Sequence, residues 1–186
     1  MTAQAFLSLA TAFGLSATAG LNAYIPLLIV ALLSRTTSLV TLNEPYDALG
    51  SWWVIATLAV LLVVEILVDK VPAADTVNDI VHTFIRPAAG AILFAASTSV
   101  IGLHPVVAAI CGVVLAGGVH VAKAGGRSVV TATTAGLGNP IVSTIEEILA
   151  AVMSLVSIVA PYVVLGLAII AVSLLIWWYR RRRRTC

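Results

Sequence analysis

Six long apolar stretches follow one another along the chain, separated by short polar segments. Most have close to the roughly 20 helical residues that cross ~30 Å of hydrocarbon. The segments are 5–33, 52–68, 87–100, 105–122, 140–160 and 161–179. Because only helices and closed barrels satisfy the backbone inside a bilayer, we expect an all-α polytopic transmembrane bundle of about six spans. Residues 1–179 form its single domain.

Two stretches carry helix-breaking residues, near Gly20–Pro26 and near Gly136–Pro140. Glycine weakens a helix and proline removes a backbone donor, so broken helices are predicted at both places. The strings Thr18–Asn22 and Thr134–Asn139 are similar. An internal repeat and a chance match both stay open. A three-plus-three repeat would place its halves in opposite orientations, a common transporter plan.

Composition and charge exclude a soluble domain and indicate an orientation. The chain is 61% hydrophobic and 10% charged, whereas soluble domains are about half apolar and a quarter charged. With the tail Arg180–Arg184 in the cytoplasm, nine of the ten basic residues lie inside and Arg35 lies outside. Tracing six spans from this tail predicts that both termini are cytoplasmic. The tail, residues 180–186, is expected to bind anionic lipid, not nucleic acid.

Polar groups beside the two breaks are candidate ligand contacts. They are Asn22 and Asn139, with the backbone at Gly20, Gly136 and Gly138. Paired interruptions of this kind point to substrate sites in transporters. The alternative is that the glycines allow close helix packing while the asparagines cap helix ends.

Five ionisable residues lie within or at the ends of apolar segments: Glu65, Asp69, His120, Glu146 and Glu147. A charge near mid-bilayer costs ~2.5–3.5 kcal/mol on insertion scales, so such residues usually face the bundle interior and mark pathways. They predict a cation site or a proton relay, with one member of the adjacent glutamate pair facing inward. The alternative is pairing with the basic residues at the same end, which are Lys70, Arg86, Lys123 and Arg127.

Residues 72–86 are predicted to form an amphipathic helix on the membrane surface. Asp75, Asp79 and His82 fall on its polar face and could hold a divalent metal. The alternative is a solvated face on which Asp79 pairs with His82. No catalytic or cofactor-binding motif is present in the sequence, so we expect a protein that is not an enzyme and needs no cofactor.

Two motifs carry a family resemblance: Gly20-Leu-Asn-Ala-Tyr-Ile-Pro26, and Asp69-Lys-Val-Pro72 with His82-Thr-Phe-Ile-Arg-Pro87. At these positions the chain resembles small bacterial integral membrane proteins catalogued as a domain of unknown function. The resemblance implies a multi-pass protein of the bacterial inner membrane. It implies no activity and no functional residues.

The leading functional hypothesis is a small transporter or channel for a cation or a proton-coupled small solute. A non-catalytic scaffold or accessory subunit is the alternative, with Gly112, Gly117 and Gly118 offering a face to a partner. A third is a lipid-handling protein. An acid-lined cavity would favour transport, whereas direct pairing of the acids with basic residues would favour the scaffold. A homo-oligomer is expected because so small a bundle often needs a second copy to enclose a pathway.

Overall fold

The computed structural model describes residues 2–69 and 72–183, and all regular structure within them is helical. The elements are α1 (Thr2–Leu21), α2 (Tyr24–Thr36), η1 (Tyr46–Gly50), α3 (Trp52–Val68), α4 (Pro72–Thr98), η2 (Ser99–Ile101), α5 (Pro105–Thr134), α6 (Asn139–Val159) and α7 (Pro161–Arg183). Four of them, α1, α4, α5 and α6, are long and apolar enough to cross a bilayer. The predicted all-α membrane bundle is therefore confirmed.

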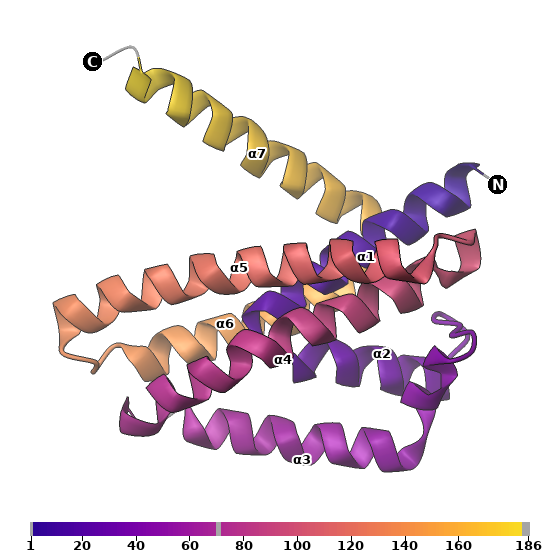
Figure 1. Cartoon of the computed structure of the whole chain (residues 1–186), viewed down its shortest axis with the longest axis horizontal. Helices are drawn as coiled ribbons and strands as arrows, with labels where there is room; N and C mark the ends of the chain where they lie inside the picture. The colour runs from indigo at the N-terminus through magenta and orange to yellow at the C-terminus, as the bar shows by residue number, and fades with distance from the viewer. Residues whose placement is uncertain (1, 70–71, 184–186) are drawn as a thin grey trace.

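The first apolar stretch is two helices that run in opposite directions (Figure 1). Leu7, near the start of α1, lines the same cavity as Leu39, which follows α2. Leu15, further along α1, and Val30, in the middle of α2, belong to one core cluster. The break at Asn22 is thus a reversal of the chain and not an interruption within one span.

This reversal places the start of α1 at the end of the bundle that holds residues 37–51 and 99–104 (the turn end). The opposite end holds residues 65–86 and 120–147 (the charged end). The described part of α7 points away from the turn end, so the start of α1 and the described end of α7 lie at opposite ends of the bundle in Figure 1. The side of the membrane that each terminus faces stays a prediction.

The segments α1–α3 and α5–α7 run in the same sequence of directions, with α4 between them (Figure 1). Both helix breaks lie at the charged end. Helix α4 packs on α1 and on α5, α2 packs on α3, and α6 packs on α7. The opposite orientation expected of two repeated halves is not observed, because one additional helix separates them.

Helices α4 and α5 are longer than the sequence pattern indicates. Helix α4 continues through Pro87, so the expected surface helix and the following span are one element. The polar stripe faces inward at two described positions: the exposed fraction is 2% for His82 and 0% for Arg86. The expected solvated face is therefore wrong at these two residues, whereas the side chains of Asp75 and Asp79 lie outside the described part of the structure. Helix α5 likewise continues through Gly125 and Gly126 to Thr134.

Small residues let the central helices approach closely. A Cβ at Gly112 of α5 would lie 2.6 Å from the carbonyl carbon of Gly90 in α4. A Cβ at Gly20 of α1 would lie 2.5 Å from the carbonyl oxygen of Ala116. The hydrophobic effect does not drive helices together in lipid, so van der Waals packing at close crossings of this kind stabilises their association instead. Gly112 therefore lies inside the bundle and offers no face to a partner protein.

The α4–α5 crossing predicts a specific loss of stability. Gly112→Ala should lower the free energy of unfolding by about 2 kcal/mol or more, because the added methyl overlaps the α4 backbone. Gly118→Ala is the matched control in the same helix, since no atom lies within 4 Å of its added Cβ. It should be neutral or slightly stabilising. Thermal unfolding in detergent measures both, and equal midpoints would contradict the close crossing.

The reversal after α1 predicts which positions face the same side of a membrane. In a background with Cys111→Ser and Cys186→Ser, cysteines at Ala3 and Ser38 should react with an impermeant thiol reagent from one side. A cysteine at Ser128 should react only from the other side, because α5 carries it to the charged end. Labelling of positions 3 and 128 from the same side would contradict the reversal and support the prediction that residues 5–33 form a single span.

Candidate functional site

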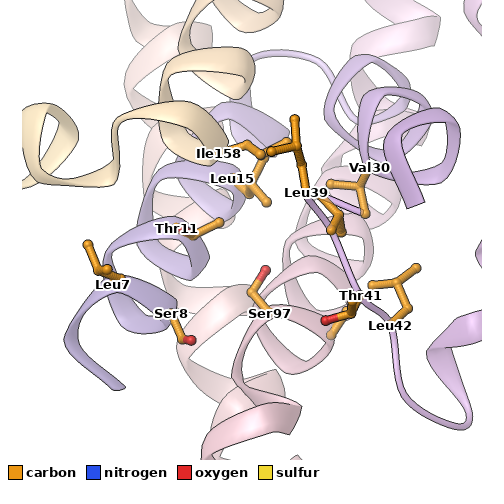
Figure 2. Close-up of a pocket in the computed structure, with 12 residues that line it drawn as sticks. Leu7, Ser8, Thr11, Leu15, Val30, Leu39, Thr41, Leu42, Ser97 and Ile158 are labelled. Atoms are coloured by element: carbon orange, nitrogen blue, oxygen red, sulfur yellow. The ribbon is translucent and has the colours of Figure 1, made fainter. Parts of the chain in front are cut away.

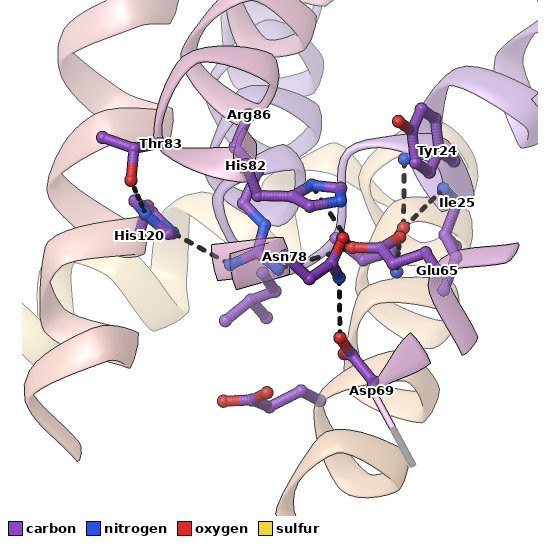
Figure 3. Close-up of polar contacts among 12 residues, drawn as sticks. Tyr24, Ile25, Glu65, Asp69, Asn78, His82, Thr83, Arg86 and His120 are labelled. Carbon is purple, nitrogen blue, oxygen red and sulfur yellow. Dashed lines mark hydrogen bonds and ion pairs between the residues drawn. The ribbon is translucent and has the colours of Figure 1, made fainter. Parts of the chain in front are cut away.

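Charged and polar side chains converge inside the charged end (Figure 3). Ten of them are at most 9% exposed: Asn22, Glu65, Asp69, His82, Arg86, His120, Lys123, Arg127, Asn139 and Ser143. Glu65 lies 13 residues after Trp52 at the turn end, which is about 20 Å along α3. A ~30 Å hydrocarbon layer that began at Trp52 would therefore include Glu65, at a depth where unpaired charges are costly.

Glu65 is the centre of the first half of this cluster. Its Oε2 accepts a hydrogen bond from Nδ2 of Asn22 at 2.6 Å. Its Oε1 lies 3.4 Å from Nη2 of Arg86 and 3.5 Å from Nδ1 of His82. The Glu65 side chain is 1% exposed, so a compensating charge is required. Glu65 thus links the α1–α2 break to two residues of α4.

Asn22 has two roles at once. Its Oδ1 accepts hydrogen bonds from the backbone N–H groups of Tyr24 and Ile25, each at 3.0 Å. These are the first residues of α2, so Asn22 satisfies donors that a helix start leaves unpaired. The same amide donates to Glu65. The predicted capping role and the predicted role in a polar site therefore coincide.

Arg86 fixes the ionisation state of His120. Nη1 of Arg86 lies 2.9 Å from Nδ1 of His120, and Nε2 of His120 lies 3.2 Å from Oγ1 of Thr83. A guanidinium can only donate hydrogen bonds, so Nδ1 must accept and carries no proton. His120 is therefore neutral in this arrangement, and its Nε2–H can donate to Thr83.

The second half of the cluster joins α3, α5 and α6. Nη2 of Arg127 lies 3.3 Å from Oδ2 of Asp69 and 3.1 Å from Oε2 of Glu146. Nζ of Lys123 lies 3.0 Å from the same Glu146 oxygen and donates to the carbonyl of Leu21 at 2.7 Å. Lys123 thus ties the last turn of α1 to α5 and α6.

Asp69 has polar partners besides Arg127. Its Oδ1 accepts a hydrogen bond from Nδ2 of Asn78 at 2.8 Å, and its Oδ2 accepts from Oγ of Ser143 at 2.9 Å. Oγ of Ser143 also lies 3.1 Å from Oε1 of Glu147. Of the two adjacent glutamates, Glu146 makes the contacts with Lys123 and Arg127.

The second break differs from the first. Ala135 and Gly136 have φ angles of 50° and 85°, which end α5 in the left-handed region where glycine is favoured. Asn139 begins α6 and its Oδ1 accepts a hydrogen bond from Oγ1 of Thr131 at 3.1 Å. Gly138 packs against Val130 and Thr134. The break therefore makes local contacts between α5 and α6.

The predicted metal site is tested only in part. Among the described residues, no group of three His, Cys, Asp or Glu side chains could hold a metal ion. The side chains of Asp75 and Asp79 lie outside the described part of the structure, as do Lys70 and Arg184. His82 lies beside Glu65, and its ring contacts Tyr24 edge-on with centroids 5.6 Å apart.

Two cavities lie at the turn end, away from the charge cluster. The first, of about 180 Å³, lies between α1, α2, the segment 39–42 and the ends of α4 and α6 (Figure 2). The second, of about 530 Å³, is lined by Arg35 and Asp47 among others and shares Val40, Thr41 and Leu42 with the first. Neither cavity is lined by a predicted site residue. The acids are instead paired directly with Arg86, Lys123 and Arg127.

Sequence reasoning identified the acids and their basic partners but missed the neutral residues that connect them. These are Tyr24, Asn78, Thr83 and Ser143. A signal was present in the spacing, since Asn78, His82 and Arg86 recur every four residues and so share a helix face. Lys123 and Arg127 have the same spacing on α5.

The central pair predicts a large effect on stability. Glu65→Gln should lower the free energy of unfolding by about 3 kcal/mol or more, because Arg86 is then buried without its partner. Adding Arg86→Gln should recover part of the loss. Glu44→Gln, in an exposed loop, is the charge-matched control and should change stability by less than about 0.5 kcal/mol. Thermal unfolding in detergent measures all four proteins, and an unchanged Glu65→Gln midpoint would contradict the pairing.

Comparison with known proteins identifies a family but no characterised relative. The family described as Domain of unknown function (DUF4126) matches residues 9–181, which is nearly the whole chain. The chain belongs to this family, as the motifs around Asn22 and Arg86 predicted. No curated protein and no solved structure matches it.

Proposed function

We propose that this member of the DUF4126 family is a small membrane transporter whose charge cluster closes one end of the bundle. The observation that carries the proposal is the arrangement along one axis: cavities at the turn end and a buried ion-pair network at the charged end. A transporter open to one side and closed to the other would have such an arrangement. The acids then form the closure and not the substrate site.

The network connects the parts of the protein that would have to separate. Arg127 of the last three-helix segment pairs with Asp69, which follows α3 of the first, and Lys123 of the last segment donates to the carbonyl of Leu21 in α1. Transporters built from two segments of equal direction use the interface between them as the pathway. Loss of the Arg127–Asp69 and Lys123–Leu21 contacts would open the charged end.

The proposal favours coupling to protons over transport of a bare cation. Glu65, Asp69 and Glu146 each contact an arginine or lysine, so they form no open acidic site for a cation. Arg86 contacts both Glu65 and His120. Its withdrawal would leave a carboxylate and a neutral imidazole, two groups that accept protons, facing the opened end. Opening and proton uptake would then be linked.

The distribution of charge indicates how the bundle is oriented in the membrane and what it contacts there. The positive-inside rule places the charged end in the cytoplasm and the turn end outside a bacterial inner membrane. The guanidinium of Arg181 lies 5.1 Å from the ring centroid of Trp177, as at a membrane interface. We keep the proposals that the arginine tail binds anionic lipid and that the protein is a homo-oligomer.

A scaffold or accessory subunit is the second candidate, and direct pairing of the acids favours it. A fully paired network can specify one arrangement of helices without moving. The cavities favour the transporter, because a purely structural bundle has no need of open volume at one end. Flux separates the two candidates.

The test is uptake by purified protein in liposomes that contain a pH-sensitive dye. Small uncharged solutes and alkali cations are added outside, with and without an inward proton gradient. The proposal expects solute-dependent acidification of the lumen, reduced at least tenfold in the Glu146→Gln/Glu147→Gln variant because its inner closure lacks an ion-paired carboxylate. Glu44→Gln is the control and should match the wild type. Folded protein that moves neither solute nor protons would assign the chain to the scaffold class.

A further inference from the structure

Hydroxyl groups are concentrated in the smaller cavity at the turn end. Ser8 and Thr11 lie one helical turn apart on α1, Ser97 lies near the end of α4, and Thr41 lies in the segment after α2. In Figure 2 the oxygens of Thr41 and Ser97 point toward the centre of the cavity. The other lining side chains are apolar, and none of the described residues that line the cavity is charged.

These four hydroxyls differ from most others in the protein. Ser and Thr in a helix commonly donate to a backbone carbonyl of the preceding turn. Thr98, the residue after Ser97, does so to Phe94 at 2.8 Å, and Thr18 of α1 does so to Leu15 at 2.8 Å. Within residues 2–69 and 72–183, the hydroxyls lining the cavity make no hydrogen bond to protein. Their donors and acceptors are available to a bound molecule.

The size and polarity of the cavity limit what can occupy it. About 180 Å³ corresponds to roughly six water molecules at ~30 Å³ each, or to one small organic molecule. The cavity is partly open, since Leu39 and Thr41 are exposed, but none of its described lining residues is charged, so a charged ligand would find no counter-charge there. An apolar ligand would leave the hydroxyls unsatisfied.

We propose that this cavity binds a small uncharged solute that has a short apolar chain and one or two hydroxyl or carbonyl groups. The leucines contact the chain, and the hydroxyls of Thr11 and Ser97 bond its polar group. The larger cavity, which shares Thr41, is the entrance. This inference rests on the proposed function, since it names the substrate class of the same pathway.

The experiment measures equilibrium binding of 1,2-pentanediol to the protein in nanodiscs by ligand-observed NMR, with empty nanodiscs as the blank. Pentanoate and pentylammonium are the charged comparison ligands of equal chain length. Thr11→Val/Ser97→Ala removes two cavity hydroxyls with little change in shape. Thr57→Val/Ser128→Ala removes two exposed hydroxyls elsewhere and is the matched control.

The proposal expects saturable diol binding that weakens about twenty-five-fold in Thr11→Val/Ser97→Ala, since each neutral hydrogen bond contributes a factor of about five. The control variant should bind as the wild type does. Equal binding by the cavity variant, or tighter binding of either charged ligand, would overturn it. Diol binding that occurs in detergent but is lost in nanodiscs would assign the cavity to a lipid acyl chain and also overturn it.

The binding and flux experiments test the two proposals separately. Diol binding by a protein that moves no solute would support the binding site and contradict the transporter function. Proton-coupled uptake of other solutes by a protein that does not bind the diol would support the transporter function and contradict this binding site.

Discussion

The fold depends on the pairing of Glu65 with Arg86 inside an apolar bundle. Neither side chain has access to water, and each would be strongly unfavourable alone. The pair therefore constrains where α3 can lie against α4, and Asn22 extends the constraint to the start of α2. Lys123 adds the end of α1. Helix positions that apolar packing leaves loosely defined are in this way specified by polar contacts.

The two ends of the bundle have different mechanical characters. At the charged end, ion pairs from four helices are mutually dependent, so the loss of one charge leaves another uncompensated. At the turn end, the helices enclose open volume lined by small hydroxyls and leucines. Ion pairs hold the helices together at the charged end, whereas cavities leave room for them to move at the turn end. The bundle can therefore change shape by opening the charged end while the cavities at the turn end shrink.

The sequence predicted the all-α membrane bundle because apolar segments of span length have few alternative structures. It also offered, as the alternative to an open acidic site, pairing of the acids with Arg86, Lys123 and Arg127, but not which acid would contact which base. It failed where the chain reverses at Asn22, since a hairpin and a kinked single span share the same apolar pattern. The polar stripe through His82 and Arg86 was recognised but assigned to water, because periodicity identifies a face without saying what covers it. The cavity hydroxyls were missed because Ser and Thr usually bond their own helix.

The single helix between the two like-directed segments has a consequence for how they insert in a membrane. A three-helix unit begins on one side of a membrane and ends on the other, so two units joined directly would insert with opposite orientations. Helix α4 restores the direction of the second unit. Two three-helix units of equal direction in one chain therefore require an odd number of helices between them, and α4 is that helix.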